Sequence, residues 1–213
     1  MKIKWWGHAT FLITTSDNKK ILTDPYNEKL PYKKITDKAD YVTVSHDHFD
    51  HNAVDLLKGS PEVIKENTGF EDDHIKFEGI SVYHDDAHGN KRGANNIFII
   101  TTDEFKIAHF GDLGHELEKE QLAKLMDIDI LLIPVGGNYT IDAKKAKEIV
   151  DEIKPKVILP MHYKTDVLDF PITGVDEFLS FFDKESIDII DGPEVEIKEL
   201  PSKQKLYVLD HVR

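Results

Sequence analysis

The chain has 213 residues, of which 40% are hydrophobic and 31% charged, a composition typical of a globular protein rather than a disordered one. Its 27 basic and 40 acidic residues give a net charge of −13, which argues against a protein that mainly binds nucleic-acid phosphates or anionic lipid. It contains no cysteine, so disulfides, thiolate zinc sites, iron–sulfur clusters and cysteine nucleophiles are excluded. Any metal must therefore be held by nitrogen and oxygen.

The length predicts about one domain, spanning residues 1–213. The first eight residues lack the apolar core and cleavage site of a secretory signal, and the longest apolar run, 128–135, is too short to span a bilayer. We therefore expect a cytoplasmic protein that acts on a small molecule, with no nucleic-acid or membrane partner. The sequence leaves the oligomeric state open.

In the first 60 residues, alternating hydrophobic side chains predict a short antiparallel meander with strands around 3–5, 11–13 and 21–23. The β-branched run Tyr41–Ser45 is typical of a buried strand. Residues 52–59 have helical spacing and end on a glycine, which predicts a helix there. The segment between this strand and this helix is therefore expected to be a loop.

Beyond residue 79 the pattern first predicts three strands, at 80–83, 96–101 and 105–110, with a turn at 102–104 between the last two. Strands and helices then alternate, with helices predicted at 116–126, 143–153 and 175–182 and strands at 130–134 and 157–160. A charged segment at 198–205 is expected to be loosely held. Together these elements favour an α/β (α+β) fold in which helices cover sheets.

The loop after the strand Tyr41–Ser45 holds three histidines and two aspartates within six positions, 46–51. Residues two apart on a chain leaving a strand project to the same side, so His46 and His48 can bind one cation. Asp50 and His51 follow a change of chain direction and can face a second cation. Imidazole and carboxylate ligands suit Zn²⁺, Mn²⁺ or Fe²⁺ at an open catalytic site.

The pattern His46-x-His48-x-Asp50-His51 resembles the metal-binding signature of the metallo-β-lactamase superfamily of hydrolases. The resemblance covers nearly the whole chain and implies a four-layer αββα sandwich with the site at one edge of two sheets. It also implies three more ligands at strand ends, a histidine, an aspartate that bridges two metals, and a last histidine.

Three later segments match these expectations in order. His84 follows the strand 80–83, Asp112 follows the strand 105–110, and His162 follows the strand 157–160. His88 competes with His84 for the first of these roles, and we prefer His84 because it lies directly at a strand end.

From the resemblance, His46, His48 and His84 are expected to hold one metal, Asp50, His51 and His162 the other, and Asp112 to bridge them. Zinc is the favoured ion, with manganese or iron as alternatives. Two such ions about 3.5–4 Å apart would supply hydroxide at neutral pH, with Asp50 orienting the water or moving its proton.

Other residues bear on the substrate. Trp6-Gly7-His8-Ala9-Thr10 resembles the branch that contains L-ascorbate 6-phosphate lactonase and N-acyl-phosphatidylethanolamine phospholipase D. This resemblance implies that His8 lies near the metals, where it could contact the substrate. Arg92 could hold a phosphate or carboxylate, and His115 could support catalysis beside Asp112. Asn138 and Tyr163, which follow two predicted strands, are further candidates for substrate contact.

The sequence therefore predicts a metal-dependent hydrolase that cleaves an ester, lactone or phosphodiester of a small anionic metabolite with a dinuclear-metal hydroxide. One alternative is a nuclease or cyclic-nucleotide phosphodiesterase of the same fold. Another is a metal-binding or regulatory protein that keeps the site without turnover.

Overall fold

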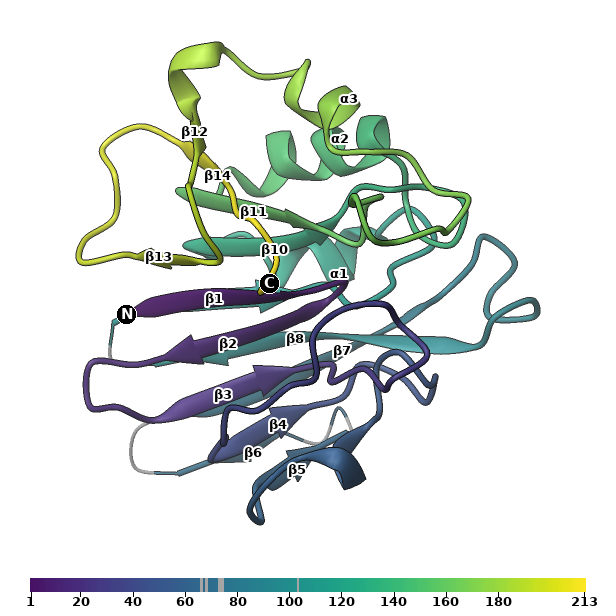
Figure 1. Ribbon diagram of the computed structural model, residues 1–213. Coiled ribbons are helices and arrows are strands. Elements are labelled where there is room, and N and C mark those ends of the chain that lie inside the picture. Colours follow the sequence, from purple (N-terminus) through teal and green to yellow (C-terminus); the bar gives the residue numbers. More distant parts are fainter. Residues whose placement is uncertain (66, 68, 73–74, 103) are drawn as a thin grey trace.

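The structure, a computed structural model, describes residues 1–65, 67, 69–72, 75–102 and 104–213, and in this part of the chain the strands form two sheets (Figure 1). The first sheet has, in spatial order, β13 (Glu194–Glu196), β1 (Lys2–Gly7), β2 (Thr10–Thr14), β3 (Lys20–Thr23), β4 (Tyr41–Thr43) and β5 (Glu62–Ile64). The second has β12 (Ile187–Ile189), β14 (Lys205–Val208), β11 (Val157–Met161), β10 (Ile130–Pro134), β9 (Lys106–His109), β8 (Ala94–Thr101), β7 (Lys76–Tyr83) and β6 (Phe70–Glu71).

The expected N-terminal meander is present, since β1 pairs antiparallel with β2 and β2 with β3. Ile3 lies opposite Ile13, and Ile13 opposite Ile21, so these three buried side chains share one face of the sheet. β3 pairs parallel with β4. The chain therefore leaves β3 and β4 at the same end of the sheet, and the histidine motif begins there.

Strand direction in the second sheet also brings distant segments to one end. β7 and β9 each pair antiparallel with β8, so both leave the sheet at the same end. β10 pairs parallel with β9 and β11 parallel with β10, so β11 also ends there. The residues that follow β7, β9 and β11 are therefore neighbours, although almost 80 positions separate the first from the last.

The helix α2 (Ala143–Ile153) has the bounds that the sequence predicts. Asp142 caps its start by accepting a hydrogen bond from the Lys145 N–H, and Lys154 ends it with a left-handed backbone (φ 56°). Its buried face, which includes Ile149 and Val150, packs against the second sheet. An amphipathic helix of eleven residues with both ends capped is a strong local signal, which explains the agreement.

The other helices are shorter than predicted. α1 (Lys119–Ala123) and α3 (Asp176–Leu179) occupy only part of the expected ranges, and each is followed by a turn with i to i−3 hydrogen bonds. Instead of the helix predicted at 52–59 there is a single 3-10 turn, η1 (Val54–Leu56). The Ala53 N–H bonds to the Pro25 carbonyl and no side chain caps the turn, so this segment follows tertiary contacts rather than its helical spacing.

Several elements carry no clear sequence signal. β5, β6, β12 and β13 have two or three residues each, too few for a hydrophobic period to show. β14 begins at Lys205, the last residue of the segment expected to be loose, and a second 3-10 turn, η2 (Lys184–Ser186), precedes β12. The turn predicted at 102–104 includes residue 103, which lies outside the described residues.

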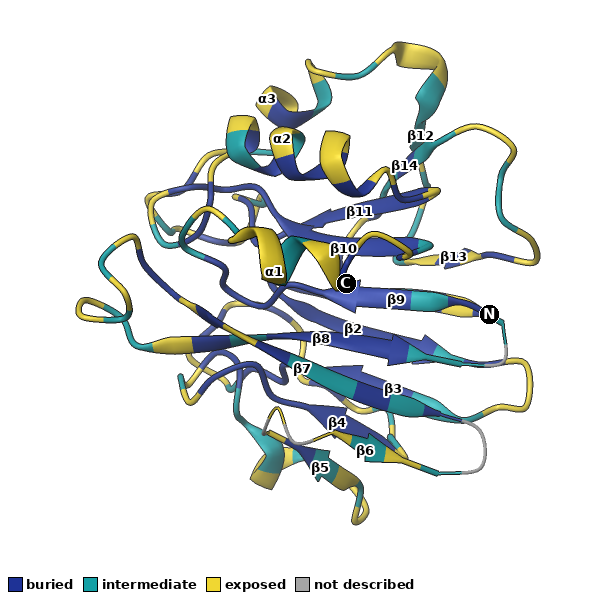
Figure 2. Ribbon diagram, turned by 180° about the vertical axis from the view of Figure 1, so that it is seen from behind, coloured by how far each residue is buried: buried dark blue, intermediate teal, exposed yellow. Residues whose placement is uncertain are grey.

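The two sheets pack face to face, and the larger core cluster contains buried residues of both sheets and of α2. Figure 2 shows buried residues in dark blue along the strands of both sheets. Neighbouring residues of β1 face opposite sides, so that Trp5 belongs to this core whereas Trp6 belongs to a second cluster on the outer face of the first sheet. Loop residues such as Tyr26 and Leu168 cover that outer face. The predicted αββα sandwich is confirmed. Over the outer face of the first sheet, the described chain is mostly loop with one 3-10 turn, η1.

No helix in the described residues is both long enough and apolar enough to cross a membrane.

Candidate metal centre

The first group of ligand atoms comes from both sheets. His46 and His48 lie in the loop after β4, and His84 directly follows β7. The Nε2 atom of His46 is 3.0 Å from Nδ1 of His48, and the ring centroids of His46 and His84 are 4.8 Å apart. Their ligand atoms all lie within 4.8 Å of one another, so one ion can contact all three. His88, the rival of His84, has an exposed side chain beside Tyr83, outside this group.

Asp112 lies at the centre of the site. Its Oδ2 atom is 3.2 Å from Nε2 of His84, 3.2 Å from Nε2 of His51 and 3.3 Å from Nε2 of His162. It is also 4.0 Å from Nε2 of His46. One carboxylate thus reaches histidines of both predicted metal positions.

A second group consists of His8, His51, Asp112 and His162, all buried, with their ligand atoms within 4.8 Å of one another. Asp50, which the resemblance places at this position, lies beside the group. Its Oδ2 atom is 3.3 Å from Nε2 of His8 and 4.0 Å from Nε2 of His51. The structure thus brings together all seven predicted ligands and adds His8.

Asp24, which the sequence analysis missed, orients two of these histidines. Its buried carboxylate accepts hydrogen bonds from the Ser45 N–H (2.7 Å), the Ser45 hydroxyl (2.6 Å) and Nδ1 of His51 (2.8 Å). The Ser45 hydroxyl is also 2.9 Å from Nδ1 of His46. Asp24 directly follows β3, so the reasoning applied to the other strand ends could have found it.

Asn95, also missed, shapes the turn that carries Asp112. Its buried side chain accepts a hydrogen bond from the Asp112 N–H (3.0 Å) and donates one to the Phe110 carbonyl (2.9 Å). Gly111 has a positive φ of 51°, and a Cβ there would lie 2.4 Å from the Asn95 oxygen. The turn therefore needs glycine at this position, and Asn95 holds the Asp112 backbone in place.

These surroundings change the pKa values of the site. Burial lowers the pKa of His46 to about 2 and that of His8 to about 4, so both are neutral and able to bind a metal at pH 7. Burial alone would raise the pKa of Asp112, but His162 and His51 hold it well below the usual value. The pKa of His51 is raised well above its usual value, because Asp112 and Asp24 outweigh the effect of burial.

The donor set fits divalent cations. Nε2 of His51 and Oδ1 of Asp112 are buried, and neither has a hydrogen-bond partner among the described residues. Buried polar atoms without partners are unfavourable, and a cation between them would provide the missing interaction. Imidazole nitrogen and carboxylate oxygen, without thiolate, suit Zn²⁺, Mn²⁺ and Fe²⁺.

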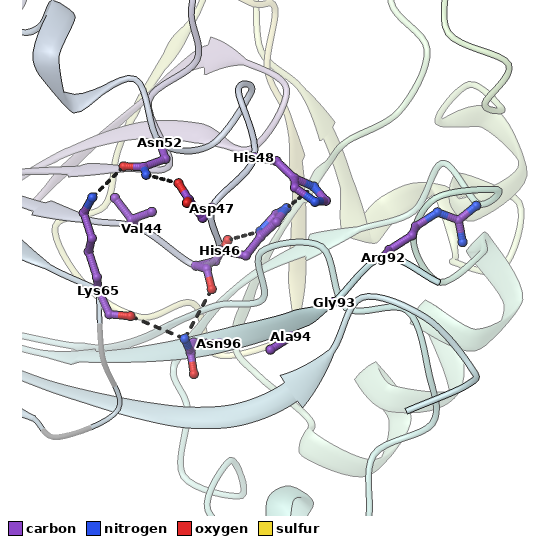
Figure 3. Close-up of a pocket in the computed structure, with 11 residues that line it drawn as sticks. Val44, His46, Asp47, His48, Asn52, Lys65, Arg92, Gly93, Ala94 and Asn96 are labelled. Atoms are coloured by element: carbon purple, nitrogen blue, oxygen red, sulfur yellow. Dashed lines mark hydrogen bonds between the residues drawn. The ribbon is translucent and has the colours of Figure 1, made fainter. Parts of the chain in front are cut away.

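Two cavities open beside the centre. A cavity of about 290 Å³ is lined by His48, Phe49, Asp50, His84, Arg92, Asp112, Tyr139, His162 and Phe170. A neighbouring cavity of about 480 Å³ shares His48 and Arg92 with it and extends past His46 to Lys65, whose ammonium group donates to the Asn52 side chain (Figure 3). In Figure 3, Lys65 and Arg92 lie at opposite sides, with His46 and His48 between them.

Arg92 sits at the boundary of the two cavities. Its guanidinium carbon is 5.4 Å from the ring centroid of Tyr139, and no ion pair is recorded for it with a described residue. Asp85 fixes the backbone of this loop, since its carboxylate accepts N–H bonds from Ala87, Gly89, Lys91 and Arg92 at 2.7–3.0 Å. Burial alone would raise the pKa of Asp85, but these hydrogen bonds lower it to about 2.

Three other predicted residues lie away from the lining of both cavities. Tyr163 is buried, with its ring 5.1 Å from that of Trp5. Asn138 is exposed, and its neighbour Tyr139 lines the smaller cavity instead. His115 accepts a hydrogen bond from the Tyr83 N–H at Nε2 and donates from Nδ1 to the Glu116 carbonyl, so both ring nitrogens are occupied.

Comparison with known proteins agrees with this geometry. Residues 2–162 match the family model described as the beta-lactamase superfamily domain. Two proteins described as UPF0173 metal-dependent hydrolases are similar, one from Pyrobaculum islandicum (34% identical over 206 residues, 83% of this chain and 88% of the relative) and one from Pyrobaculum arsenaticum (32% over 202 residues, with the same coverage).

A crystal structure of a proposed Zn-dependent hydrolase of the metallo-beta-lactamase superfamily from Thermotoga maritima is 39% identical, with a TM-score of 0.83. The match covers 98% of this chain and 97% of that one. The fold, the family match and these relatives agree, and the chain belongs to the metallo-β-lactamase superfamily as a metal-dependent hydrolase.

Proposed function

We propose that the protein hydrolyses an ester, lactone or phosphodiester bond of a small anionic metabolite at a site for two divalent cations. The observation that carries the proposal is the position of Asp112, whose Oδ2 atom lies within 3.3 Å of His84 on one side and of His51 and His162 on the other. A carboxylate between two histidine groups is the arrangement that a bridging ligand needs.

In this proposal His46, His48 and His84 hold the first cation, Asp50, His51 and His162 the second, and Asp112 both. We propose zinc, with Mn²⁺ or Fe²⁺ as alternatives, because all three suit nitrogen and oxygen ligands. Bound divalent ions lower the pKa of water and polarise the oxygen of the bond under attack.

Asp50 is suited to orient the attacking water and to accept its proton. Its carboxylate lines the smaller cavity. Although burial alone would raise the pKa of Asp50, the nearby imidazoles of His8 and His51 keep it below the usual value. The group is therefore ionised at neutral pH and accepts hydrogen bonds. Among the described residues, only His8 and His51 form ion pairs with this carboxylate. An Asp50 oxygen can therefore accept a hydrogen bond from a water molecule.

The cavity beside the centre supports a small anionic substrate. Arg92 presents a guanidinium group without a recorded carboxylate partner, which suits a phosphate or carboxylate. Phe49, Tyr139 and Phe170 provide apolar walls, and the volume of about 290 Å³ favours a molecule of metabolite size. The net charge of −13 opposes binding of a nucleic acid.

The test is hydrolysis of three substrate panels, lactones, carboxylate esters and bis-p-nitrophenyl phosphate, by protein loaded with Zn²⁺ or Mn²⁺. We expect turnover in at least one panel, loss of turnover after chelation and recovery when the ion is returned. Hydrolysis of phosphodiesters alone would favour the cyclic-nucleotide phosphodiesterase or nuclease alternative. No turnover by fully metallated protein on any panel would contradict the proposal and favour a regulatory role.

A further inference from the structure

We propose that His8 is an eighth ligand of this centre and binds the second cation through Nε2, beside His51, His162 and Asp112. This inference rests on the proposed metal site but not on its hydrolytic activity. The resemblance implies that His8 lies near the metals as a contact for the substrate, whereas the structure groups its ring with the side chains that could hold an ion.

The distances fit coordination to one ion. Two ligands whose bonds to a metal are each about 2.1 Å long lie roughly 3.0–4.2 Å apart, depending on the angle between the bonds. Nε2 of His8 is 3.3 Å from Oδ2 of Asp50, and the ligand atoms of His8, His51, Asp112 and His162 all lie within 4.8 Å of one another. The ring centroid of His8 is 4.1 Å from that of His162.

Apart from the Asp50 oxygen 3.3 Å from Nε2, the described residues offer the His8 ring no polar partner. The residue is fully buried, and neither ring nitrogen has a hydrogen bond of good geometry to a described residue. A buried imidazole without partners is unfavourable, and a cation at Nε2 would give that atom a strong interaction. A structural histidine would be expected to hydrogen-bond at both nitrogens, as His115 does.

The backbone is also shaped to hold this ring. His8 has a positive φ of 53°, which is uncommon for a residue with a side chain and is tolerated where the surroundings enforce it. The His8 carbonyl accepts hydrogen bonds from Nε1 of Trp5 (3.0 Å) and from the His162 N–H (3.2 Å). Gly7 is required in this turn, since a Cβ there would lie 2.5 Å from the Tyr32 ring. The turn ties His8 directly to another ligand.

An additional histidine changes which ion each position favours. The first position would have three imidazoles and the shared carboxylate of Asp112, a set of four that suits tetrahedral Zn²⁺. The second would have three imidazoles and the carboxylates of Asp50 and Asp112, which is more than a tetrahedral ion accepts. Ions that accept five or six nitrogen and oxygen ligands, such as Mn²⁺ or Fe²⁺, are therefore favoured at the second position.

The test compares His8→Asn with His88→Asn. Both histidines have a left-handed backbone (φ 53° and 54°), which asparagine tolerates, but His88 is exposed and outside the ligand groups. We measure bound Mn²⁺ and Zn²⁺ per chain by elemental analysis, and the visible spectrum of Co²⁺-loaded protein. We expect His8→Asn to lose affinity for one of two ions by at least about tenfold. His88→Asn should bind as the wild type does.

A second variant separates coordination from a hydrogen bond to Asp50. Glutamine can donate an N–H to this carboxylate but is a poor metal ligand, so His8→Gln should also lose the second ion. If His8→Gln keeps two ions and the wild-type Co²⁺ spectrum, His8 is a hydrogen-bond donor only and the inference is wrong.

If neither variant folds, the wild type still provides a test. In proton NMR of the protein with two Co²⁺ ions, each coordinating histidine gives a shifted exchangeable N–H signal, so six signals support the inference and five contradict it. A wild type that binds fewer than two ions would contradict the two-metal site itself. Two bound ions without hydrolysis would contradict only the proposed function.

Discussion

Asp112 is the residue on which both positions of the proposed two-cation site depend, since its carboxylate reaches histidines of each group. We expect Asp112→Ala to lower metal affinity by more than the roughly 10–100-fold that follows loss of a residue hydrogen-bonded to a ligand. His48→Ala should remove the ion of the first group. Elemental analysis of purified protein checks this, with His88→Ala as the control, and full metal content in Asp112→Ala would exclude Asp112 from the site.

Asp24 acts one step away from the metal by orienting His51 and Ser45. In Asp24→Asn, an amide group replaces one acceptor oxygen, so at least one of these bonds is lost and His51 is no longer held. We expect metal affinity to fall by about 10–100-fold while the fold is kept. Titration with a competing chelator measures this, and Asp55→Asn, an exposed aspartate on η1, is the matched control. Equal affinities in the two variants would contradict the assigned role.

At the scale of elements, the loop between β7 and β8 presents Arg92 to both cavities and depends on Asp85 for its shape. We expect Asp85→Asn to raise KM for an anionic substrate by about tenfold, with metal content unchanged, because the carboxylate oxygen that holds the Lys91 and Arg92 N–H groups is lost. Steady-state kinetics and elemental analysis together check this prediction.

The neighbouring residue offers a close control for this loop. Asp86 is exposed and contacts only the Lys91 ammonium group among the described side chains, so Asp86→Asn removes the same charge without releasing the backbone. A rise in KM shared by both variants would mean that loop charge, rather than the position of Arg92, is what changed.

At the scale of the whole molecule, the centre joins the two sheets, so bound ions should stabilise the complete fold. An ion whose free concentration is about 1,000 times its Kd adds about 4 kcal/mol to the free energy of unfolding when it binds. For a chain of this length each kcal/mol raises Tm by about 2–4 °C, so chelation should lower Tm by about 8–16 °C. Calorimetry with and without a chelator measures the shift, and an unchanged Tm would show that folding does not depend on the ions.

Metal binding should also depend on pH. In the metal-free fold Asp112 and Asp24 raise the pKa of His51 well above its usual value, although burial opposes this, and so they favour the imidazolium form with a proton on Nε2 as well as on Nδ1. A cation that binds Nε2 must displace this proton, and raising the pH removes the competition. Affinity should therefore increase from pH 6 to pH 8, with proton release on binding. Calorimetric titration in buffers of different ionisation enthalpy measures the released protons, and none released at pH 7 would contradict the raised pKa.

Some features follow from the sequence because their signals are local. The hydrophobic period and caps of α2 determine its bounds, and the alternation in β1, β2 and β3 determines the meander. The motif His46 to His51 predicts a metal site because few structural reasons would place so many ligands directly after a buried strand, and its resemblance to a known signature indicates the superfamily.

Only the tertiary structure decided which remaining residues join the site. Asp24 and Asn95 were not among the predicted residues, and His8 was predicted near the site but not as a ligand. Strand pairing brings their segments together, and this pairing depends on contacts between distant parts of the chain. The same dependence on distant contacts explains why residues 52–59 form one 3-10 turn and why the short edge strands were missed. The hydrophobic pattern of a segment predicts which of its faces is buried, whereas the position of a metal site depends on where the ends of separate strands meet.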